Sequence, residues 1–146
     1  LVVQKGTPLV EIKKVIVPVD LTKESLQIVN IAGDIANIFG GKVHILYEKQ
    51  SDERMAIQMK TRVHIVKNNY DERGVEAEYI KLEGKGSFTK KIEKYAEAQN
   101  AELLAFAYHS ESLLPQFDAF GQSLITNSLK LPCMVVNSKL ASALYF

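Results

Sequence analysis

Short apolar runs alternate along this chain with stretches in which apolar residues recur at helical spacing. Four of the runs are nearly continuous hydrophobes, a pattern typical of strands covered on both faces, as in parallel sheets. The remaining run, over 76–82, alternates more strongly with polar residues, which predicts a strand nearer to the edge of the sheet. The runs occupy residues 14–19, 42–47, 76–82, 101–107 and 133–136.

The helical stretches between these runs have recognisable ends. An apolar stripe over 28–39 stops at Gly40, and a second stripe over 55–70 stops at Gly74. Glycine is the residue that most often follows the last turn of a helix. Ser87 is a suitable N-cap for a third helix, because its hydroxyl can accept a hydrogen bond from an amide of the first turn.

A fourth helix is predicted from near Gln116 to Lys130, with Pro132 ending it. Strands and helices then alternate from the first strand to the fifth, and crossovers of this length give parallel strands with right-handed connections. The predicted fold class is α/β, with helices on both faces of a five-stranded parallel sheet. Ligands of such folds bind beyond the carboxyl ends of the strands, which directs attention to 20–22, 47–49, 82–86 and 107–121.

Composition and charge narrow the functional classes. The 146 residues suit one domain, and 18 Lys and Arg against 17 Asp and Glu leave a formal net charge of +1. A nearly balanced charge gives no basic footprint for a nucleic acid. No apolar run is long enough for a membrane span, and the single cysteine, Cys133, excludes an internal disulfide. These features predict a cytoplasmic protein with no nucleic-acid or membrane partner.

No motif in the chain assembles a catalytic centre. Neither a P-loop nor a glycine-rich dinucleotide fingerprint occurs, and the three histidines lack metal-ligand spacing. His109 follows the fourth strand and is a candidate general base, but no nucleophile motif accompanies it. Cys133 opens an apolar strand, which favours an inert buried thiol. Asp20 at the end of the first strand either caps a helix or accepts hydrogen bonds from a ligand.

The order and spacing of these segments resemble a universal stress protein domain over 13–139. The resemblance rests on the opening segment 15–25, the entry to the third strand at 74–78, the fourth strand at 101–106 and the closing strand at 131–136. It implies an adenine nucleotide alpha-hydrolase-like sheet with strand order 3-2-1-4-5. It also implies that Asp20 faces an adenine nucleotide and that domains pair through the last strand, Cys133–Asn137.

Nucleotide-binding members of that family carry G-x2-G-x9-G-[ST] after the fourth strand. Ala107 and Ser110 stand where the first two glycines are expected, and the spacing to Gly121 is one residue too long. Gln122 follows Gly121, and Ser123 comes one place late. Residues with a Cβ adopt positive φ at a cost of about 1 kcal/mol. The candidate nucleotide cleft comprises Pro18, Val19, Asp20, Thr22, Ala107, Ser110, Gly121, Gln122 and Ser123.

Two functions are consistent with this degenerate motif. The first is a non-catalytic stress-response module that needs no cofactor and acts through dimerisation or partner contacts. The alternative is a domain that binds ATP or AMP as a nucleotide sensor or slow ATPase. A phospho-accepting receiver domain requires an acidic cluster at the first strand and an Asp at the third. Here Asp20 stands alone and Leu82-Glu83 ends the third strand, which excludes it.

The first residues suggest a tandem arrangement. Leu1-Val2-Val3 resembles Met134-Val135-Val136 of the closing strand, as expected for the end of a preceding similar domain. The predicted organisation is a tail or linker over 1–9, a universal stress protein-like domain over 10–139 and a C-terminal tail over 140–146.

Overall fold

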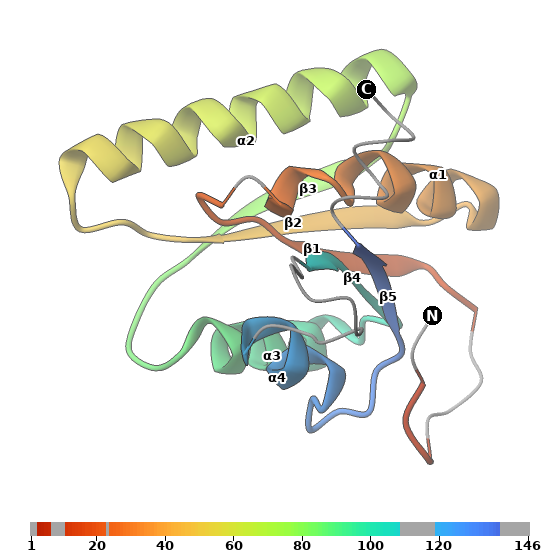
Figure 1. Cartoon of the computed structure of the whole chain (residues 1–146). Helices are drawn as coiled ribbons and strands as arrows, with labels where there is room; N and C mark the ends of the chain where they lie inside the picture. Colours follow the sequence, from red (N-terminus) through yellow and green to blue (C-terminus); the bar gives the residue numbers. More distant parts are fainter. Residues whose placement is uncertain (1–2, 7–10, 23, 109–118, 138–146) are drawn as a thin grey trace.

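The computed structural model describes residues 3–6, 11–22, 24–108 and 119–137. Strands and helices alternate in the predicted order (Figure 1). The strands are β1 (Lys14–Pro18), β2 (Lys42–Glu48), β3 (Ala77–Leu82), β4 (Leu103–Tyr108) and β5 (Cys133–Asn137). The helices are the short 3-10 turn η1 (Glu24–Leu26), α1 (Val29–Phe39), α2 (Glu53–Arg73), α3 (Phe88–Gln99) and α4 (Ala119–Ile125).

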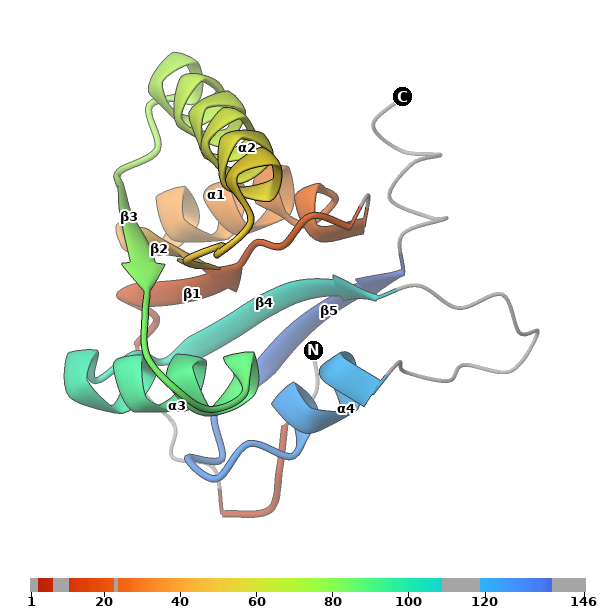
Figure 2. The ribbon, with the colours of Figure 1, turned by 90° about the vertical axis from the view of Figure 1, so that its left-hand side faces the viewer.

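The strands form one parallel sheet in the order β3-β2-β1-β4-β5. Helices α1 and α2 cover one face and α3 and α4 cover the other, which gives three layers (Figure 2). The predicted fold class and strand order are therefore confirmed. The polar third run forms β3 at one edge of the sheet, and β5 forms the other edge.

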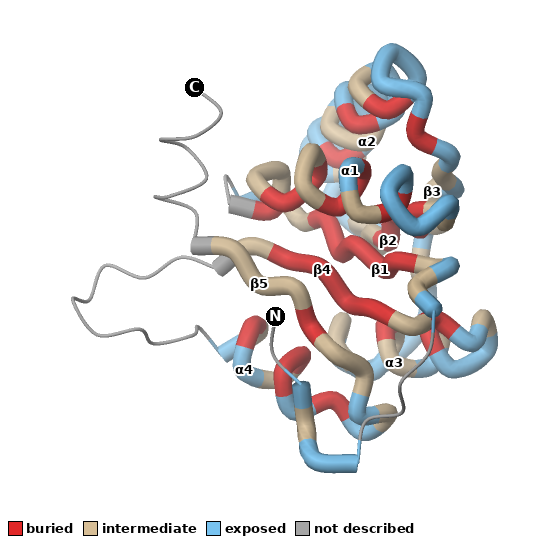
Figure 3. Tube along the Cα trace, turned by 90° about the vertical axis from the view of Figure 1, so that its right-hand side faces the viewer, coloured by how far each residue is buried: buried red, intermediate tan, exposed pale blue. Residues whose placement is uncertain are grey.

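Two hydrophobic cores lie on the two faces of the sheet. Val15 and Val17 of β1 point into the core under α1 and α2, whereas Ile16 points into the core over α3 and α4. All three side chains are fully buried, which explains why this strand reads as an unbroken apolar run. Figure 3 shows that burial is concentrated along β1 and β4 and is lower along β5 at the edge.

The ends of the first three helices follow from local chemistry. Gly40 and Gly74 end α1 and α2 in the left-handed conformation, with φ of 64° and 67°. The Ser87 hydroxyl accepts a hydrogen bond of 3.2 Å from the Lys90 amide and caps α3, as predicted.

The fourth helix is shorter than its apolar pattern predicts. It ends at Ile125, not at Lys130, because the buried side chain of Asn127 takes over the hydrogen bonds that would continue it. Its Nδ2 donates to the carbonyls of Leu124 at 2.7 Å and Leu131 at 3.1 Å, and its Oδ1 accepts from the Leu131 amide at 2.8 Å. Asparagine thereby fixes a turn that leads directly into β5.

Candidate functional site

A cavity of about 150 Å³ lies at the carboxyl ends of β1 and β4. These two strands are neighbours in the sheet but are separated by two other strands in sequence, so the cavity occupies the topological switch point. Its volume is about half of the ~300 Å³ at which ordinary small-molecule pockets begin, so it could enclose only part of a small molecule. It is lined by Pro18, Asp20, Thr22, Ser25, Phe106, Ala107 and Phe120.

Asp20 organises the turn that follows β1. Its Oδ1 accepts hydrogen bonds from the amide of Thr22 at 2.9 Å and from the hydroxyl of the same residue. Neither residue caps α1, since that helix begins at Val29 and its N-cap, Ile28, makes no side-chain cap bond. Asp20 also lines the cavity, and no hydrogen bond to its Oδ2 atom involves the described residues.

Two further residues, absent from the predicted site, hold this turn in place. The Ser25 hydroxyl lies 2.9 Å from the carbonyl oxygen of Asp20 and 3.3 Å from that of Thr22. Arg62 of α2 donates through Nη1 to the Asp20 carbonyl at 2.8 Å and to the Thr22 carbonyl, and lies 3.3 Å from the Ser25 hydroxyl. Arg62 is 42 residues from Asp20 in sequence, and no motif links the two.

The remaining predicted residues on β1 and β4 divide into those that line the cavity and those that do not. Pro18 and Ala107 line it. Val19 is fully buried in the core under α1 and α2, and its amide donates to the Leu46 carbonyl at 2.8 Å. Ala107 belongs to β4 and has no positive φ, so the expected conformational cost does not arise there. Ser110 lies outside the described residues.

The part of the glycine motif that falls on α4 faces away from the cavity. The Ser123 hydroxyl lies 2.6 Å from the Phe120 carbonyl and 2.6 Å from the hydroxyl of Thr89 on α3. Gly121 is buried, Gln122 is exposed, and neither lines the cavity. Instead the ring of Phe120 lines it and stacks on Phe88, with ring centroids 5.4 Å apart and planes inclined by 9°.

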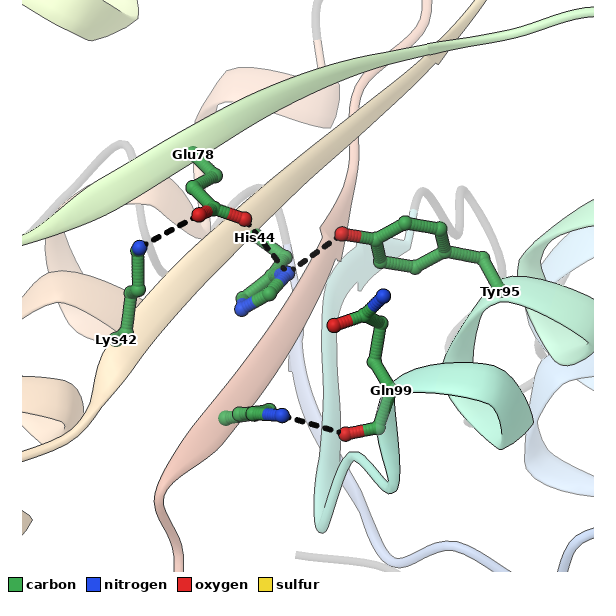
Figure 4. Close-up of polar contacts among 6 residues, drawn as sticks. Lys42, His44, Glu78, Tyr95 and Gln99 are labelled. Atoms are coloured by element: carbon green, nitrogen blue, oxygen red, sulfur yellow. Dashed lines mark hydrogen bonds and ion pairs between the residues drawn. The ribbon is translucent and has the colours of Figure 1, made fainter.

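A second polar cluster lies at the opposite, amino end of the sheet (Figure 4). His44 of β2 is 2% exposed, and its Nδ1 lies 2.7 Å from the hydroxyl of Tyr95 on α3. Glu78 of β3 bridges Lys42 at 2.7 Å and lies 3.8 Å from His44 Nδ1. The Nε2 atom of His44 has no hydrogen-bond partner within the described residues, although it is buried.

Burial shifts the pKa of His44 and Cys133, whereas a hydrogen bond shifts that of Glu78. Desolvation is the largest effect on His44 and lowers the pKa of its imidazole below 6.5, with Glu78 opposing the shift. A hydrogen bond from Lys42 lowers the pKa of Glu78. Burial raises the pKa of the Cys133 thiol to about 12, and the side chain is fully buried, which confirms the predicted core thiol.

Two searches of the described residues returned nothing. No group of three or more His, Cys, Asp or Glu side chains in these segments is arranged to hold a metal ion. No helix among them combines the length and the apolar character needed to cross a membrane.

The comparisons with known proteins bear on the fold. The sequence matches no protein-family model, and a search of curated proteins gives no match. Among solved structures, a universal stress protein from Archaeoglobus fulgidus is similar, with a TM-score of 0.69 at 17% identity over 86% of this chain and 92% of that one. A universal stress protein in complex with cAMP gives a TM-score of 0.69 at 17% identity over 88% and 99% of the two chains.

A third similar structure is the universal stress protein from Archaeoglobus fulgidus in complex with dAMP. It gives a TM-score of 0.69 at 14% identity over 88% of this chain and 99% of that one. At such low identity the similarity establishes the architecture alone. The chain has the fold of the universal stress proteins, as the resemblance implied.

Proposed function

We propose that this chain is a non-catalytic stress-response module of the universal stress protein kind, which binds the nucleoside part of an adenine nucleotide. The observation that carries the proposal is the cavity at the switch point, with Asp20 and Thr22 in its wall. Two of the similar structures are complexes with cAMP and dAMP, and this supports an adenine ligand.

The chemistry of the cavity favours a base or a ribose over a phosphate. Asp20 supplies an anionic acceptor for an amino or hydroxyl donor, and Phe106 and Phe120 supply apolar wall. A carboxylate repels phosphate, and the Ser123 hydroxyl is engaged with α3. We therefore expect that adenosine, AMP and ATP bind with similar affinity, and that ATP is not hydrolysed above background.

Calorimetric titration with adenosine, AMP and ATP tests this function. The informative variant is Asp20→Asn, because it keeps an oxygen for the Thr22 amide while replacing the other acceptor oxygen with a donor. We expect it to weaken binding by about tenfold or more, the effect of losing a hydrogen bond to a charged acceptor.

The matched control is Asp52→Asn, an exposed N-cap of α2 where asparagine serves equally well. This control should bind like the wild type. If the wild type gives no heat with any of the three ligands, nucleotide binding is wrong.

A second function, pairing with a partner or a second copy through β5, is favoured by the position of that strand. β5 is an edge strand, and the side chains of Met134, Val135 and Val136 are only half-buried. Exposed apolar edges are natural sites of strand or sheet pairing. Sedimentation of the purified protein should show a dimer. Hydrogen exchange should show that the β5 amides are protected in that dimer. A strict monomer at high concentration would rule out self-pairing.

A further inference from the structure

We propose that Arg62 is a positioning residue of the nucleotide cavity, holding the turn after β1 in its binding shape from the neighbouring helix. The proposal rests on the function proposed above and concerns the same cavity. Arg62 does not line the cavity. It acts through Asp20, Thr22 and Ser25, which do.

The first step is that Arg62 connects the turn to α2. One nitrogen, Nη1, faces the carbonyl oxygens of Asp20 and Thr22 and the Ser25 hydroxyl. These are charge-assisted hydrogen bonds, which are stronger than neutral ones. Residues 19–22 have neither helix nor strand geometry to fix them, since β1 ends at Pro18 and the short 3-10 turn η1 begins only at Glu24.

The second step concerns which polar groups of the turn remain available to a ligand when Arg62 holds the two carbonyl oxygens. With both carbonyl oxygens engaged by Arg62 and Ser25, the Asp20 carboxylate bonds the Thr22 amide and hydroxyl. The polar groups of the turn are thus divided: carbonyls are directed to α2, and the carboxylate is in the cavity wall. Without Arg62, Ser25 alone would hold both carbonyls through one hydroxyl proton.

The third step is energetic. A ligand that binds a turn already held in place does not have to order it, whereas a loose turn loses conformational entropy on binding. Because Arg62 is on α2, which packs on the core through Met59, Val66 and Tyr70, the anchor is rigid. Removal of the guanidinium should therefore weaken binding even though no ligand contact is lost.

The experiment compares three variants of the full chain: Arg62→Gln, Arg62→Lys and the control Arg73→Gln. Arg73 is a matched control because it also joins α2 to the α1 layer, through Asn30 and Asp34, but far along the helix from the cavity. The readouts are the affinity for AMP by calorimetry, amide exchange at Leu21, Thr22 and Ser25, and thermal stability.

We expect Arg62→Gln to raise the Kd for AMP by about tenfold and to speed exchange at the three amides. Arg62→Lys should recover part of both effects, because an ammonium group also donates to several acceptors. Arg73→Gln should lower thermal stability while leaving the Kd and the exchange unchanged. The Lys variant also keeps the test decisive if the Gln variant does not fold.

Two results would overturn the proposal: unchanged affinity and exchange in Arg62→Gln, or equal weakening of AMP binding by Arg62→Gln and Arg73→Gln. If the wild type binds no nucleotide, the proposed function fails separately. The exchange data then decide the positioning role: faster exchange in Arg62→Gln alone supports it, and unchanged exchange contradicts it.

Discussion

The two ends of the sheet use polar residues in different ways. At the carboxyl end, Asp20 and Thr22 line a cavity, and one oxygen of the carboxylate is unused within the described residues. At the amino end, contacts of His44 with Tyr95 and Glu78 connect β2 with α3 and β3 (Figure 4). The first arrangement leaves a group for a ligand, whereas the second connects layers of the fold. We therefore expect substitutions at the two ends to affect different measurements.

The largest effect on stability should come from His44→Ala. The His44 side chain is almost fully buried, so its truncation leaves a cavity beside β2 and removes the hydrogen-bond partner of the Tyr95 hydroxyl. Together these losses should lower the free energy of unfolding by about 2–4 kcal/mol, measured by urea denaturation. Nucleotide affinity should not change, because the cavity is at the other end of the sheet. A large loss of affinity would show that the two ends are coupled.

The pH dependence of stability provides the second prediction. His44 has a pKa below 6.5 when folded, so the unfolded chain binds more protons between that pKa and 6.5. The free energy of unfolding should therefore fall as the pH falls through 6.5, and this contribution stops changing below the folded pKa. Glu78, Lys42, Lys14 and Glu102 surround the imidazole electrostatically, but burial is the dominant cause.

Comparing how steeply stability changes with pH in the wild type and in two variants isolates the contribution of His44. In His44→Gln, which does not titrate, the fall in stability between neutral and mildly acidic pH should be smaller than in the wild type. His64→Gln, the same substitution at an exposed position of α2, is the matched control. Equal slopes in the wild type and His44→Gln would contradict the assignment.

At the cavity, Ala107→Gly should have a smaller effect. The replacement introduces the glycine that the nucleotide-binding motif was expected to have here, but Ala107 lies in β4 without a positive φ, so no strain is relieved. Glycine within a strand costs about 0.5–1 kcal/mol, so thermal denaturation should begin at a lower temperature. Nucleotide affinity should not improve. A clear gain in affinity would show that the Cβ of Ala107 obstructs the ligand.

The smallest effect is expected for Glu78→Gln at the amino end. Glu78 is exposed, and ion pairs such as its pair with Lys42 contribute little to stability because water and salt screen them. Thermal scans at low and high salt should give nearly the same midpoint for the variant and the wild type. A large, salt-sensitive loss would mean that the amino-end cluster depends on charge more than on burial.

The sequence predicted well those helix ends and strands that a nearby residue or a continuous apolar run specifies. Gly40, Gly74 and Ser87 ended or began helices as expected. The unbroken apolar runs of β1, β2 and β4 became strands buried on both faces, whereas the run of β5 lies half-buried at the edge. The predicted end of the fourth helix at Lys130 was wrong, because the side chain of Asn127 forms hydrogen bonds with Leu131 beyond the helix. A pattern of apolar residues contains no information about such a bond.

The candidate site was predictable only where strand ends determine it. Asp20, Thr22, Pro18 and Ala107 line the cavity because parallel strands end at the same side of the sheet. Arg62 contacts the turn from α2, and the Ser123 hydroxyl lies within hydrogen-bond distance of Thr89 on α3. Both contacts depend on how the helices pack against the rest of the fold. Packing of that kind depends on the folded arrangement, and a motif match does not specify it.

The central position of β1 has a consequence for how the chain is made. β1 pairs with β2 on one side and with β4 on the other, where Val15 and Ile16 face Leu103 and Leu104. During synthesis β2 and β3 both emerge before β4, because β4 follows them in the sequence. Until then, one apolar edge of β1 has no neighbour and presents a template for aggregation. The order of synthesis therefore leaves this edge of β1 without its partner strand until β4 has been made.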